Sequence, residues 1–485
     1  MKLRLRLAAA VVSVMTIMAA GMPATVAAKA PAAKAKTTKT AVYKPIKTVV
    51  PVRPKGQQDM LQFAAPALDT VRVGFIGLGM RGPGAVERFT HIPGTKIVAL
   101  CDIEQDRTEK AANIVTKAGR PAPALYYGSE DAWKDLVNRD DLDLIYLAPD
   151  WKHHVPMALY AMEKGKHVAV EVPAAHTLED IWALINTSER TRKHCIMLEN
   201  CCYDFFEANT LTMAQAGLFG EILHVEGSYI HNLADFWPYY HNNWRMEFNQ
   251  NVRGDIYATH GVGPVCQLLD IHRGDRLKTL VSMDTKAVGA PDYLEKTTGK
   301  RPEYFANGDH TMTMISTENG KTIQIQHDVV NPRPYSRMYQ LTGTKGFANK
   351  YPVSGYAFEP EALKNDSLPN HENLSAHGFI TAEQRKALEE KYMNPIIREL
   401  GDEAKEVGGH GGMDFIMDYR LVYCLRNGLP LDMDVYDMAE WCSLAPLSKL
   451  SLENGSAPVE VPDFTRGGWN KTKGYRYAFA KNPKK

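Results

Sequence analysis

Cysteine and net charge are both scarce in this sequence of 485 residues. The seven cysteines include the neighbours Cys201 and Cys202 and form no Cys-x-x-Cys motif. This spacing argues against a disulfide framework and against a cysteine-based metal site, and it favours buried thiols. The formal net charge is only +1, and no basic block stands out after residue 68. The composition therefore gives no reason to expect a nucleic-acid partner.

Long hydrophobic runs are absent after the N-terminus. There, a basic start at residues 2–6 precedes an apolar run over 7–22 and small residues at 24–30. This pattern is typical of a secretory signal peptide, and the apolar run is short for a membrane-spanning helix. We expect residues 1–28 to be removed during export to the periplasm or the exterior, which leaves a mature protein without a membrane span. An uncleaved membrane anchor is the alternative.

No internal repeat is visible, and the rest of the chain divides into three parts. Residues 29–68 are rich in Ala, Lys, Pro and Thr without a hydrophobic period, which predicts a linker or a poorly ordered arm. Strands and helices alternate over 69–200, as is typical of a parallel sheet. Residues 201–485 have a different texture and predict a second domain.

Half-buried strands characterise this second domain. Alternating apolar and polar residues predict strands at 221–231, 310–318, 322–330 and 337–346, and helices are expected at 205–217, 261–272, 381–400 and 412–427. The stretch 350–410 otherwise looks irregular. The predicted fold is thus α/β, with an N-terminal Rossmann domain followed by an α+β domain that has an open, mainly antiparallel sheet.

A glycine-rich turn follows the first strand of the N-terminal domain. Gly77, Gly79 and Gly82 form G-x-G-x-x-G between an apolar strand and a helix. They would permit a tight turn, let the backbone approach a pyrophosphate and let the helix pack closely. About 20 residues later Asp102 ends the next strand, where a carboxylate would bind the adenosine ribose hydroxyls. Together these residues predict binding of NAD rather than NADP, although an arginine at position 81 is also able to meet a 2′-phosphate.

Two further segments stand at carboxyl ends of strands in the N-terminal domain, where ligands bind in such sheets. They are APDWKHH at 148–154 and EVPAAH at 171–176. Trp151 and the histidines that follow it are suited to pack on a nicotinamide. The structural alternative is a loop at a helix start with an aromatic lid.

Tyr257 and His260 lie three residues apart, just before an apolar helix. If Thr259 or His260 caps that helix, both side chains face one cleft. A phenol and an imidazole are suitable acid and base groups when their pKa values are shifted. The alternative is a structural tyrosine beside a capping histidine. No clear carboxylate–histidine ligand set appears in the sequence, so we expect no metal.

The GLGMRG turn, Asp102 and the EVP segment together resemble the Gfo/Idh/MocA superfamily of glucose–fructose oxidoreductases and inositol dehydrogenases. Its members pair a Rossmann domain with a C-terminal α/β domain whose sheet forms a substrate face. Dehydrogenases of this superfamily usually carry Glu-Lys-Pro, with the lysine at the active site. This sequence has Glu171, Val172 and Pro173 instead, which argues against a simple sugar dehydrogenase.

A closer resemblance is to glycoside hydrolase family 109, the NAD-dependent α-N-acetylgalactosaminidases. It runs from about Val71 to Trp469 and includes the strings EVPAAHT, MLENCCY, YATHGVGP, GGHGGMDF and CLRNGLPLD. His154, where an aromatic residue is expected, and Ala258, where proline is common, depart from the pattern.

The resemblance implies a site for NAD and a site for a sugar. Besides the three glycines, the residues that would contact NAD are Met80, Arg81, Asp102, Trp151 to His154, Glu171, Val172 and Asn200. The residues that would line the sugar site are Tyr229, Arg245, Tyr257, His260 and Tyr335. Tyr257 and His260 are the candidates for catalytic proton transfer.

The resemblance also implies a reaction, the retaining hydrolysis of terminal α-N-acetylgalactosamine from glycoconjugates. In this redox route C3 of the sugar is oxidised, the C2 proton is removed, the bond at C1 breaks by elimination, water adds, and C3 is reduced again. A sugar oxidoreductase of the same fold and a non-catalytic sugar-binding protein are the alternatives. The sequence leaves the oligomeric state open, a homodimer included.

Overall fold

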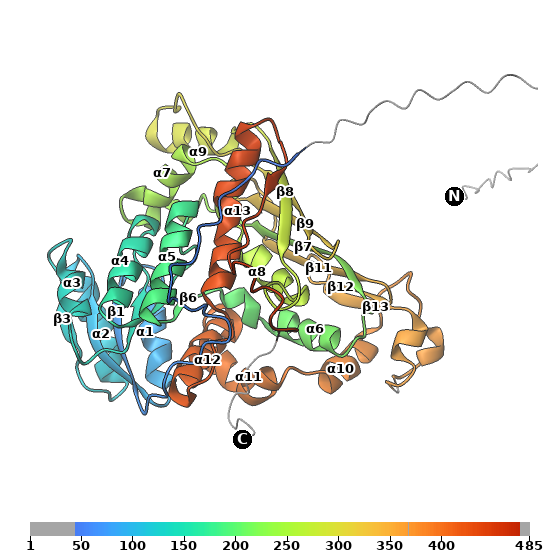
Figure 1. The fold of residues 1–485 in the computed structure, drawn as a ribbon, viewed down its shortest axis with the longest axis horizontal. Coiled ribbons are helices and arrows are strands. Elements are labelled where there is room, and N and C mark those ends of the chain that lie inside the picture. The colour runs from blue at the N-terminus through green and yellow to red at the C-terminus, as the bar shows by residue number, and fades with distance from the viewer. Residues whose placement is uncertain (1–43, 367, 476–485) are drawn as a thin grey trace, which may run out of the picture. The chain divides into compact units, whose positions relative to one another are not determined.

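Six parallel strands form the sheet of the N-terminal domain in a computed structural model, which describes residues 44–366 and 368–475. They are β1 (Val71–Ile76), β2 (Thr95–Cys101), β3 (Ala124–Tyr126), β4 (Leu144–Leu147), β5 (His167–Val170) and β6 (Cys195–Met197). Their order in the sheet is β3-β2-β1-β4-β5-β6 (Figure 1). This is the strand order of dinucleotide-binding folds, and it confirms the predicted Rossmann domain.

Helices connect each strand of this sheet to the next. They are α1 (Gly82–His91), α2 (Gln105–Lys117), α3 (Ala132–Val137), α4 (Trp151–Glu163) and α5 (Leu178–Thr191). Ala85, Val86 and Phe89 of α1 are buried, as their spacing predicts. Because every connection returns the chain to the same end of the sheet, the carboxyl ends of all the strands lie along one edge.

The second sheet has eight strands in the order β13-β12-β11-β7-β10-β9-β8-β14. They are β7 (Ile222–Ile230), β8 (Leu277–Asp284), β9 (Thr311–Thr317), β10 (Thr322–Asp328), β11 (Ser336–Gly343), β12 (Gly346–Asn349), β13 (Gly355–Phe358) and β14 (Val459–Glu460). Only β7 and β10 pair in parallel; every other pair is antiparallel. The predicted open, mainly antiparallel sheet is therefore confirmed.

The helices of the second half differ in part from those expected. They are α6 (Phe205–Gln215), α7 (Trp244–Asn251), α8 (Thr259–Leu268), α9 (Gly289–Thr298), α10 (Ala382–Lys391), α11 (Pro395–Val407), α12 (Met413–Asn427) and α13 (Val435–Glu453). The single helix expected at 381–400 is wrong, because the Asn394 side chain caps a new helix that begins at Pro395. The stretch 350–410 is also more regular than expected, since it contains β13, α10 and α11.

Two C-terminal helices pack on the N-terminal domain. Helix α12 lies against α1, where Arg88 and Asp418 form a buried ion pair with Nε and Oδ2 2.7 Å apart. Helix α13, which the sequence analysis did not predict, lies between α5 and β8 (Figure 1). Buried side chains of both halves thus join in one hydrophobic core.

Residues 44–68 lie along the body of the protein, in contrast to the linker predicted for 29–68. Ile46 exchanges backbone hydrogen bonds with Pro458 and Glu460, and the Leu68 amide donates to the Leu425 carbonyl. The Arg53 guanidinium binds both carboxylate oxygens of Glu189 on α5. The described part of the expected linker is thus a fixed strap. The predicted signal peptide and residues 29–43 lie outside the described residues.

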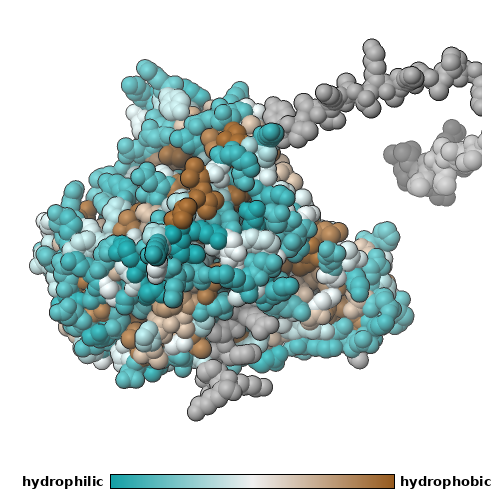
Figure 2. All heavy atoms as spheres, viewed as in Figure 1, coloured by the Kyte–Doolittle hydropathy of each residue, from teal (hydrophilic) through white to brown (hydrophobic). Residues whose placement is uncertain are grey.

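None of the helices in the described ranges is both long and apolar enough to cross a membrane. The face drawn in Figure 2 is mostly hydrophilic, with hydrophobic side chains gathered in a few small patches. Exposed hydrophobic residues include Val49 and Val52 on the strap and Phe236 and Tyr239 after β7.

Candidate active site

The turn after β1 is open to a ligand on one side only. Gly77 has a φ of +89°, and a Cβ there would lie 2.4 Å from the backbone of Ala148. A Cβ on Gly82 would lie 2.1 Å from the Gly77 carbonyl oxygen, so the start of α1 packs directly on the turn. At Gly79 the nearest atom to a Cβ would be Arg107 Nη1, 3.9 Å away. Gly79 and the exposed Met80 therefore leave the backbone accessible, as a bound pyrophosphate requires.

Asp102, after β2, holds this turn in place. Its Oδ2 accepts a hydrogen bond of 2.7 Å from the Leu78 amide, and its Oδ1 accepts one of 3.0 Å from the Glu104 amide. Arg107 approaches Oδ1 at 3.4 Å. A carboxylate offers about four lone-pair sites, so capacity remains for a ribose hydroxyl. The arrangement fits the adenosine end of NAD.

Arg81 points to the other half of the sheet. Its guanidinium binds Glu171 after β5, at 3.1 Å, and Asp414 at the start of α12, at 3.2 Å. In the strand order β5 lies on the opposite side of β1 from β2. Arg81 is therefore committed away from the ribose side, where a 2′-phosphate of NADP would need it.

Asp414 gathers residues from three parts of the chain. Its Oδ1 accepts a hydrogen bond of 2.5 Å from Asn200, and its Oδ2 lies 2.9 Å from His410 Nδ1. Burial acts to raise the pKa of Asp414, but the hydrogen bond from His410 and the charges of Arg81 and Arg88 outweigh it and hold that pKa well below its usual range. Asp414 is therefore a fixed negative charge beside the glycine turn.

The loops after β4 and β5 are tied to each other. Trp151 Nε1 donates to the Val172 carbonyl at 3.2 Å, and His154 Nδ1 lies 2.8 Å from the Pro173 carbonyl oxygen. His154 is fully buried and its pKa is lowered by desolvation, so it braces the two loops as a neutral ring. Trp151 and His154 stand in the first turn of α4.

Close packing of α8 on β7 brings the second domain to this edge. A Cβ on Gly227 of β7 would lie 2.3 Å from the Gly261 carbonyl oxygen on α8. Only glycine permits this approach of backbone to backbone. The contact places Tyr257 and His260, at the start of α8, against Tyr229 of β7, with ring centroids 4.5 Å and 5.4 Å from that of Tyr229.

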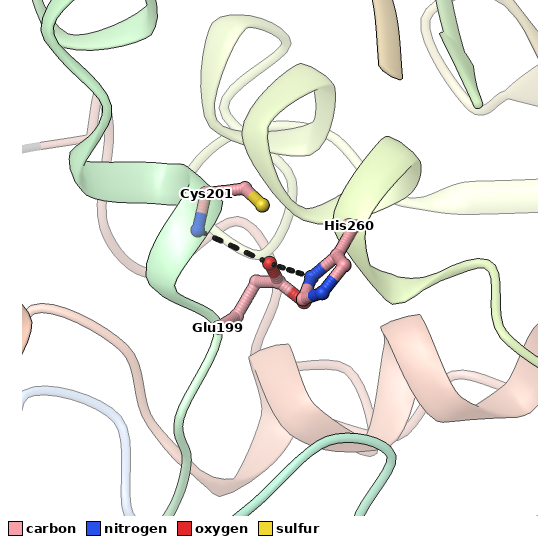
Figure 3. Close-up of side chains that lie close together, drawn as sticks. All are labelled: Glu199, Cys201 and His260. Carbon is pink, nitrogen blue, oxygen red and sulfur yellow. Dashed lines mark hydrogen bonds and ion pairs between the residues drawn. The ribbon is translucent and has the colours of Figure 1, made fainter. Parts of the chain in front are cut away.

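Glu199, His260 and Tyr257 form one chain of hydrogen bonds. Glu199 Oε1 lies 2.6 Å from His260 Nδ1, and His260 Nε2 lies 3.3 Å from the Tyr257 hydroxyl (Figure 3 shows the first contact). A carboxylate only accepts, so His260 donates through Nδ1, and Nε2 is left to accept from the phenol. Burial raises the pKa of Tyr257 well above its usual value, which keeps the phenol protonated. The chain can carry a proton between the site and His260.

Neither Thr259 nor His260 caps α8, contrary to the geometry considered from the sequence. The helix has no side-chain cap, and the His260 ring is turned toward Glu199. The prediction that there is no carboxylate–histidine set is also wrong, since Glu199 and His260 form one. The pair was missed because Glu199 follows β6 and His260 belongs to the other domain. Folding brings them together.

Glu199, Cys201 and His260 are the one group with the spacing of metal ligands among the residues that the structure describes. Hydrogen bonds account for this group without an ion, since Glu199 Oε1 also accepts from the Cys201 amide at 3.3 Å (Figure 3). Burial raises the pKa of the Cys201 thiol well above its usual value, and a neutral thiol is a poor ligand. The absence of a metal stays a prediction.

Arg245 and the aromatic residues around it line the part of the site that was predicted to bind the sugar. The Arg245 guanidinium is 4.5 Å from the centroid of the Tyr257 ring and 5.0 Å from that of Trp151. It donates to the Tyr240 hydroxyl at 2.6 Å. Trp151 stacks near Tyr257, with centroids 5.7 Å apart. These contacts join the predicted cofactor residues to the predicted sugar residues.

Tyr335 lies farther out than the other residues predicted for the sugar site. It is 39% exposed and reaches Tyr229 only through His231, whose ring centroid is 5.0 Å from that of Tyr335. The Tyr229 hydroxyl lies within hydrogen-bond distance of His231 Nδ1, at 3.0 Å. Burial lowers the pKa of the half-buried His231 to about 4 and raises the pKa of Tyr229 to about 12, so both groups are neutral near pH 7.

Three polar residues of this site were missed from the sequence. They are Glu199, His410 and Asp414. Glu199 could have been found, because it lies two residues after β6, at the same edge of the sheet as Glu171. His410 and Asp414 lie more than 200 residues beyond that strand, in GGHGGMDF, and only the packing of α12 on α1 places them here.

Comparison with protein families divides the chain at the same place as the two sheets. Residues 71–199 match the oxidoreductase family with an NAD-binding Rossmann fold. Residues 203–471 match the C-terminal domain of glycosyl hydrolase 109.

Several bacterial proteins are similar over almost their full length. Glycosyl hydrolase family 109 protein 1 of Phocaeicola vulgatus is 68% identical over 445 residues, which cover 92% of this chain and 94% of the relative. The protein of the same name from Bacteroides thetaiotaomicron is 66% identical, with coverage of 91% and 94%. A family 109 protein of Porphyromonas gingivalis is 64% identical, with coverage of 90% and 94%.

Solved structures share the fold at low identity. A levoglucosan dehydrogenase in complex with NADH and levoglucosan superposes with a TM-score of 0.60 at 19% identity, covering 81% of this chain and all of the other. A myo-inositol 2-dehydrogenase from Lactobacillus plantarum gives 0.55 at 15% identity, with the same coverage. With the two family matches and the relatives above, these findings show that the chain belongs to glycoside hydrolase family 109, as a glycosidase built on a Gfo/Idh/MocA-type fold with NAD as its cofactor.

Proposed function

We propose that the protein hydrolyses the bond between terminal α-N-acetylgalactosamine and the rest of a glycoconjugate, with retention of configuration. The observation that carries this proposal is the chain Glu199–His260–Tyr257, which ends beside Trp151 at the edge where the Rossmann sheet holds its cofactor. The choice of sugar rests on the resemblance of the sequence to α-N-acetylgalactosaminidases.

Residues of the N-terminal domain, together with Asp414 of α12, would provide the cofactor site. The glycine turn would hold the pyrophosphate, Asp102 the adenosine ribose, and Arg81 with Glu171, Asn200 and Asp414 would border the nicotinamide half. Bound NAD would supply reversible oxidation of one sugar carbon, which acidifies the proton on the neighbouring carbon.

Proton transfer is the task of the second domain. Tyr257 would exchange a proton with the sugar, while His260 Nε2 takes the phenolic proton and Glu199 stabilises the resulting positive ring. The Arg245 guanidinium over the Tyr257 ring favours the transient phenolate electrostatically. Val172 at the position of the usual lysine removes the alternative base of sugar dehydrogenases, which favours the glycosidase over an oxidoreductase.

A single assay tests this proposal. The purified protein is incubated with a chromogenic α-N-acetylgalactosaminide without added NAD. We expect chromophore release without accumulation of NADH, and exchange of the sugar C2 hydrogen when the reaction runs in D₂O. Accumulation of NADH would identify a sugar oxidoreductase. Chromophore release would exclude the elimination route if the sugar C2 gains no deuterium in D₂O and a C2-deuterated substrate loses none.

We also propose that the protein is exported, on the basis of its basic and apolar N-terminus. N-terminal sequencing of the protein from the native cell envelope should place the mature start among residues 24–30. An intact Met1 in the membrane fraction would support the uncleaved anchor instead.

A further inference from the structure

A row of aromatic rings leads outward from the site. The His231 ring is 5.6 Å from that of Tyr229, and it contacts Phe236 at 5.5 Å and Tyr335 at 5.0 Å, measured between centroids. Tyr351 continues the row, 6.0 Å from Tyr335. We call His231, Phe236, Tyr335 and Tyr351 the outer aromatic row. Tyr229, at the inner end, is buried, whereas Tyr335 is 39% and Phe236 43% exposed, and Tyr351 is half-buried.

Contacts with the charged side chain of Arg337 hold the tyrosines of the outer aromatic row. The buried Arg337 guanidinium donates to the Tyr335 hydroxyl at 3.2 Å and lies 5.8 Å from the centroid of the Tyr351 ring. Arg337 is itself bound by Asp204 at 2.7 Å and by Glu207 at 2.8 Å. These contacts hold the rings in place, and fixed aromatic faces lose little entropy when a ligand binds.

The chemistry of the row matches a sugar. Each ring offers an apolar face, and the tyrosine hydroxyls and the His231 ring provide polar atoms at its border, as mostly apolar sites with a few placed polar groups do. A sugar ring has the complementary form, with C–H groups on its faces and hydroxyls around its edge. Phe236 and Tyr335 are separated from Tyr257 by the rings of Tyr229 and His231, so they face a different sugar from the one that meets Tyr257.

We propose that the outer aromatic row binds the sugar ring to which the cleaved residue is attached. The row would thus select glycans over glycosides with a small leaving group. This inference rests on the proposed function, because it takes the sugar at Tyr257 to be the one released.

Two substitutions test the proposal, Phe236→Ala and Tyr351→Ala. Each variant is assayed on methyl α-N-acetylgalactosaminide and on a disaccharide in which α-N-acetylgalactosamine is joined to galactose. We expect kcat/KM for the disaccharide to fall by about three- to tenfold while the methyl glycoside changes by less than about twofold. Tyr239→Ala is the matched control, because Tyr239 is 72% exposed on the same segment and should affect neither substrate.

The outcomes separate this inference from the proposed function. Equal losses of kcat/KM on both substrates, or no loss on either, would overturn the proposal that the outer aromatic row binds a second sugar. If the wild type cleaves neither substrate, the proposed function fails. The affinities of the two ligands for a Tyr257→Phe variant, measured by calorimetry, still decide the inference. In that background, the inference is supported if the disaccharide binds more tightly than the methyl glycoside and Phe236→Ala removes the difference. Equal binding of the two ligands overturns it.

Discussion

Glu199 determines how the His260 ring is held. It is fully buried, its Oε1 accepts from His260 Nδ1 and from the Cys201 amide, and it lies two residues after the end of β6. A charged acceptor at this place fixes both the tautomer and the orientation of the ring, so that Nε2 faces Tyr257. Glu199 is therefore a positioning residue, while Tyr257 and His260 are the candidates that meet the sugar.

Replacing Glu199 should impair catalysis without loss of the cofactor. We expect Glu199→Gln to lower kcat by about 10²- to 10⁴-fold, the range of a positioned proton-transfer group, with a smaller change in KM. Tyr257→Phe and His260→Ala should give losses of the same order. Glu199→Asp, which keeps the charge, should restore part of kcat. Initial rates and NAD content of the purified variants are the measurements.

The control for this series is Glu247→Gln, a change of the same kind at an exposed position on α7. It should leave kcat unchanged. A Glu199→Gln variant as active as the wild type, or a Glu199→Asp variant as inactive as Glu199→Gln, would contradict the positioning role.

Asp255, two residues before Tyr257, is buried with no ion-pair partner among the described residues. Burial raises its pKa to about 7. A raised pKa means that the folded state holds the proton while the unfolded state releases it above about 4. The carboxyl group therefore costs no stability at low pH and an increasing amount as the pH rises from about 4 to 7.

Asp255→Asn should remove this pH-dependent cost. We expect the variant to gain stability over the wild type at pH 8, by up to about 4 kcal/mol if the full shift is realised, and to gain less at pH 5. Urea unfolding at the two pH values gives the difference. A gain that is equal at both, or a loss that grows with pH, would show that Asp255 is stabilised as a carboxylate.

At the scale of elements, the contact of α8 with β7 carries the reactive residues to the cofactor edge. Gly227 and Gly261 allow the two backbones to meet. His260, in the first turn of α8, and Tyr257, just before the helix, lie at the helix end that is nearest the Rossmann strands. The carboxyl ends of the Rossmann strands and the start of α8 therefore lie opposite each other.

Gly227→Ala should push α8 off the sheet. Because a Cβ there would lie 2.3 Å from a backbone oxygen that cannot rotate away, we expect a loss of stability of about 1–3 kcal/mol and a large loss of activity. NAD binding should persist, since the glycine turn is unaffected. Thermal unfolding, initial rates and NAD titration measure the three effects.

Gly378→Ala is the matched control, since nothing lies within 4 Å of a Cβ at that position. It should be neutral in stability and rate. A Gly227→Ala variant that keeps full activity would show that α8 can shift without moving the reactive residues.

At the scale of the whole molecule, the strap at 44–68 and the helices α12 and α13 bind the two sheets into one body. Glu189 on α5 is the common point. It accepts from Arg53 of the strap, from Arg466 near the C-terminus and from the Tyr436 hydroxyl on α13. The strap thus contributes to the seam between the two domains.

Loss of the Glu189 charge should destabilise both domains together. Removing one member of a buried ionic cluster leaves the others uncompensated, so we expect Glu189→Gln to lower the free energy of unfolding by about 3–5 kcal/mol. Asp106→Asn, which breaks an exposed pair with Lys110, should leave the free energy of unfolding nearly unchanged, because solvent screens that pair. Two separate transitions for Glu189→Gln, one per domain, would contradict a shared seam.

The glycine turn, the acid after β2 and the alternation of elements could all be predicted from the sequence, because each depends on neighbours close in the chain. Helix α13 could not. Most of its side chains are buried, Glu440 and Asp437 included, so it lacks the polar face by which an amphipathic helix is found. The division of residues 381–400 at Asn394 shows the same limit for a local cap.

The sequence by itself determined the family, the Rossmann domain and the cofactor, and it pointed to Tyr257 and His260 as candidates for proton transfer, since these features reside in contiguous motifs. Only the tertiary structure decided that Glu199 holds His260, that Asp414 holds Arg81 and Asn200, and that residues 44–68 form a strap. These contacts join residues far apart in the chain. Their geometry comes from backbone approach and helix packing, which no local pattern of residues encodes.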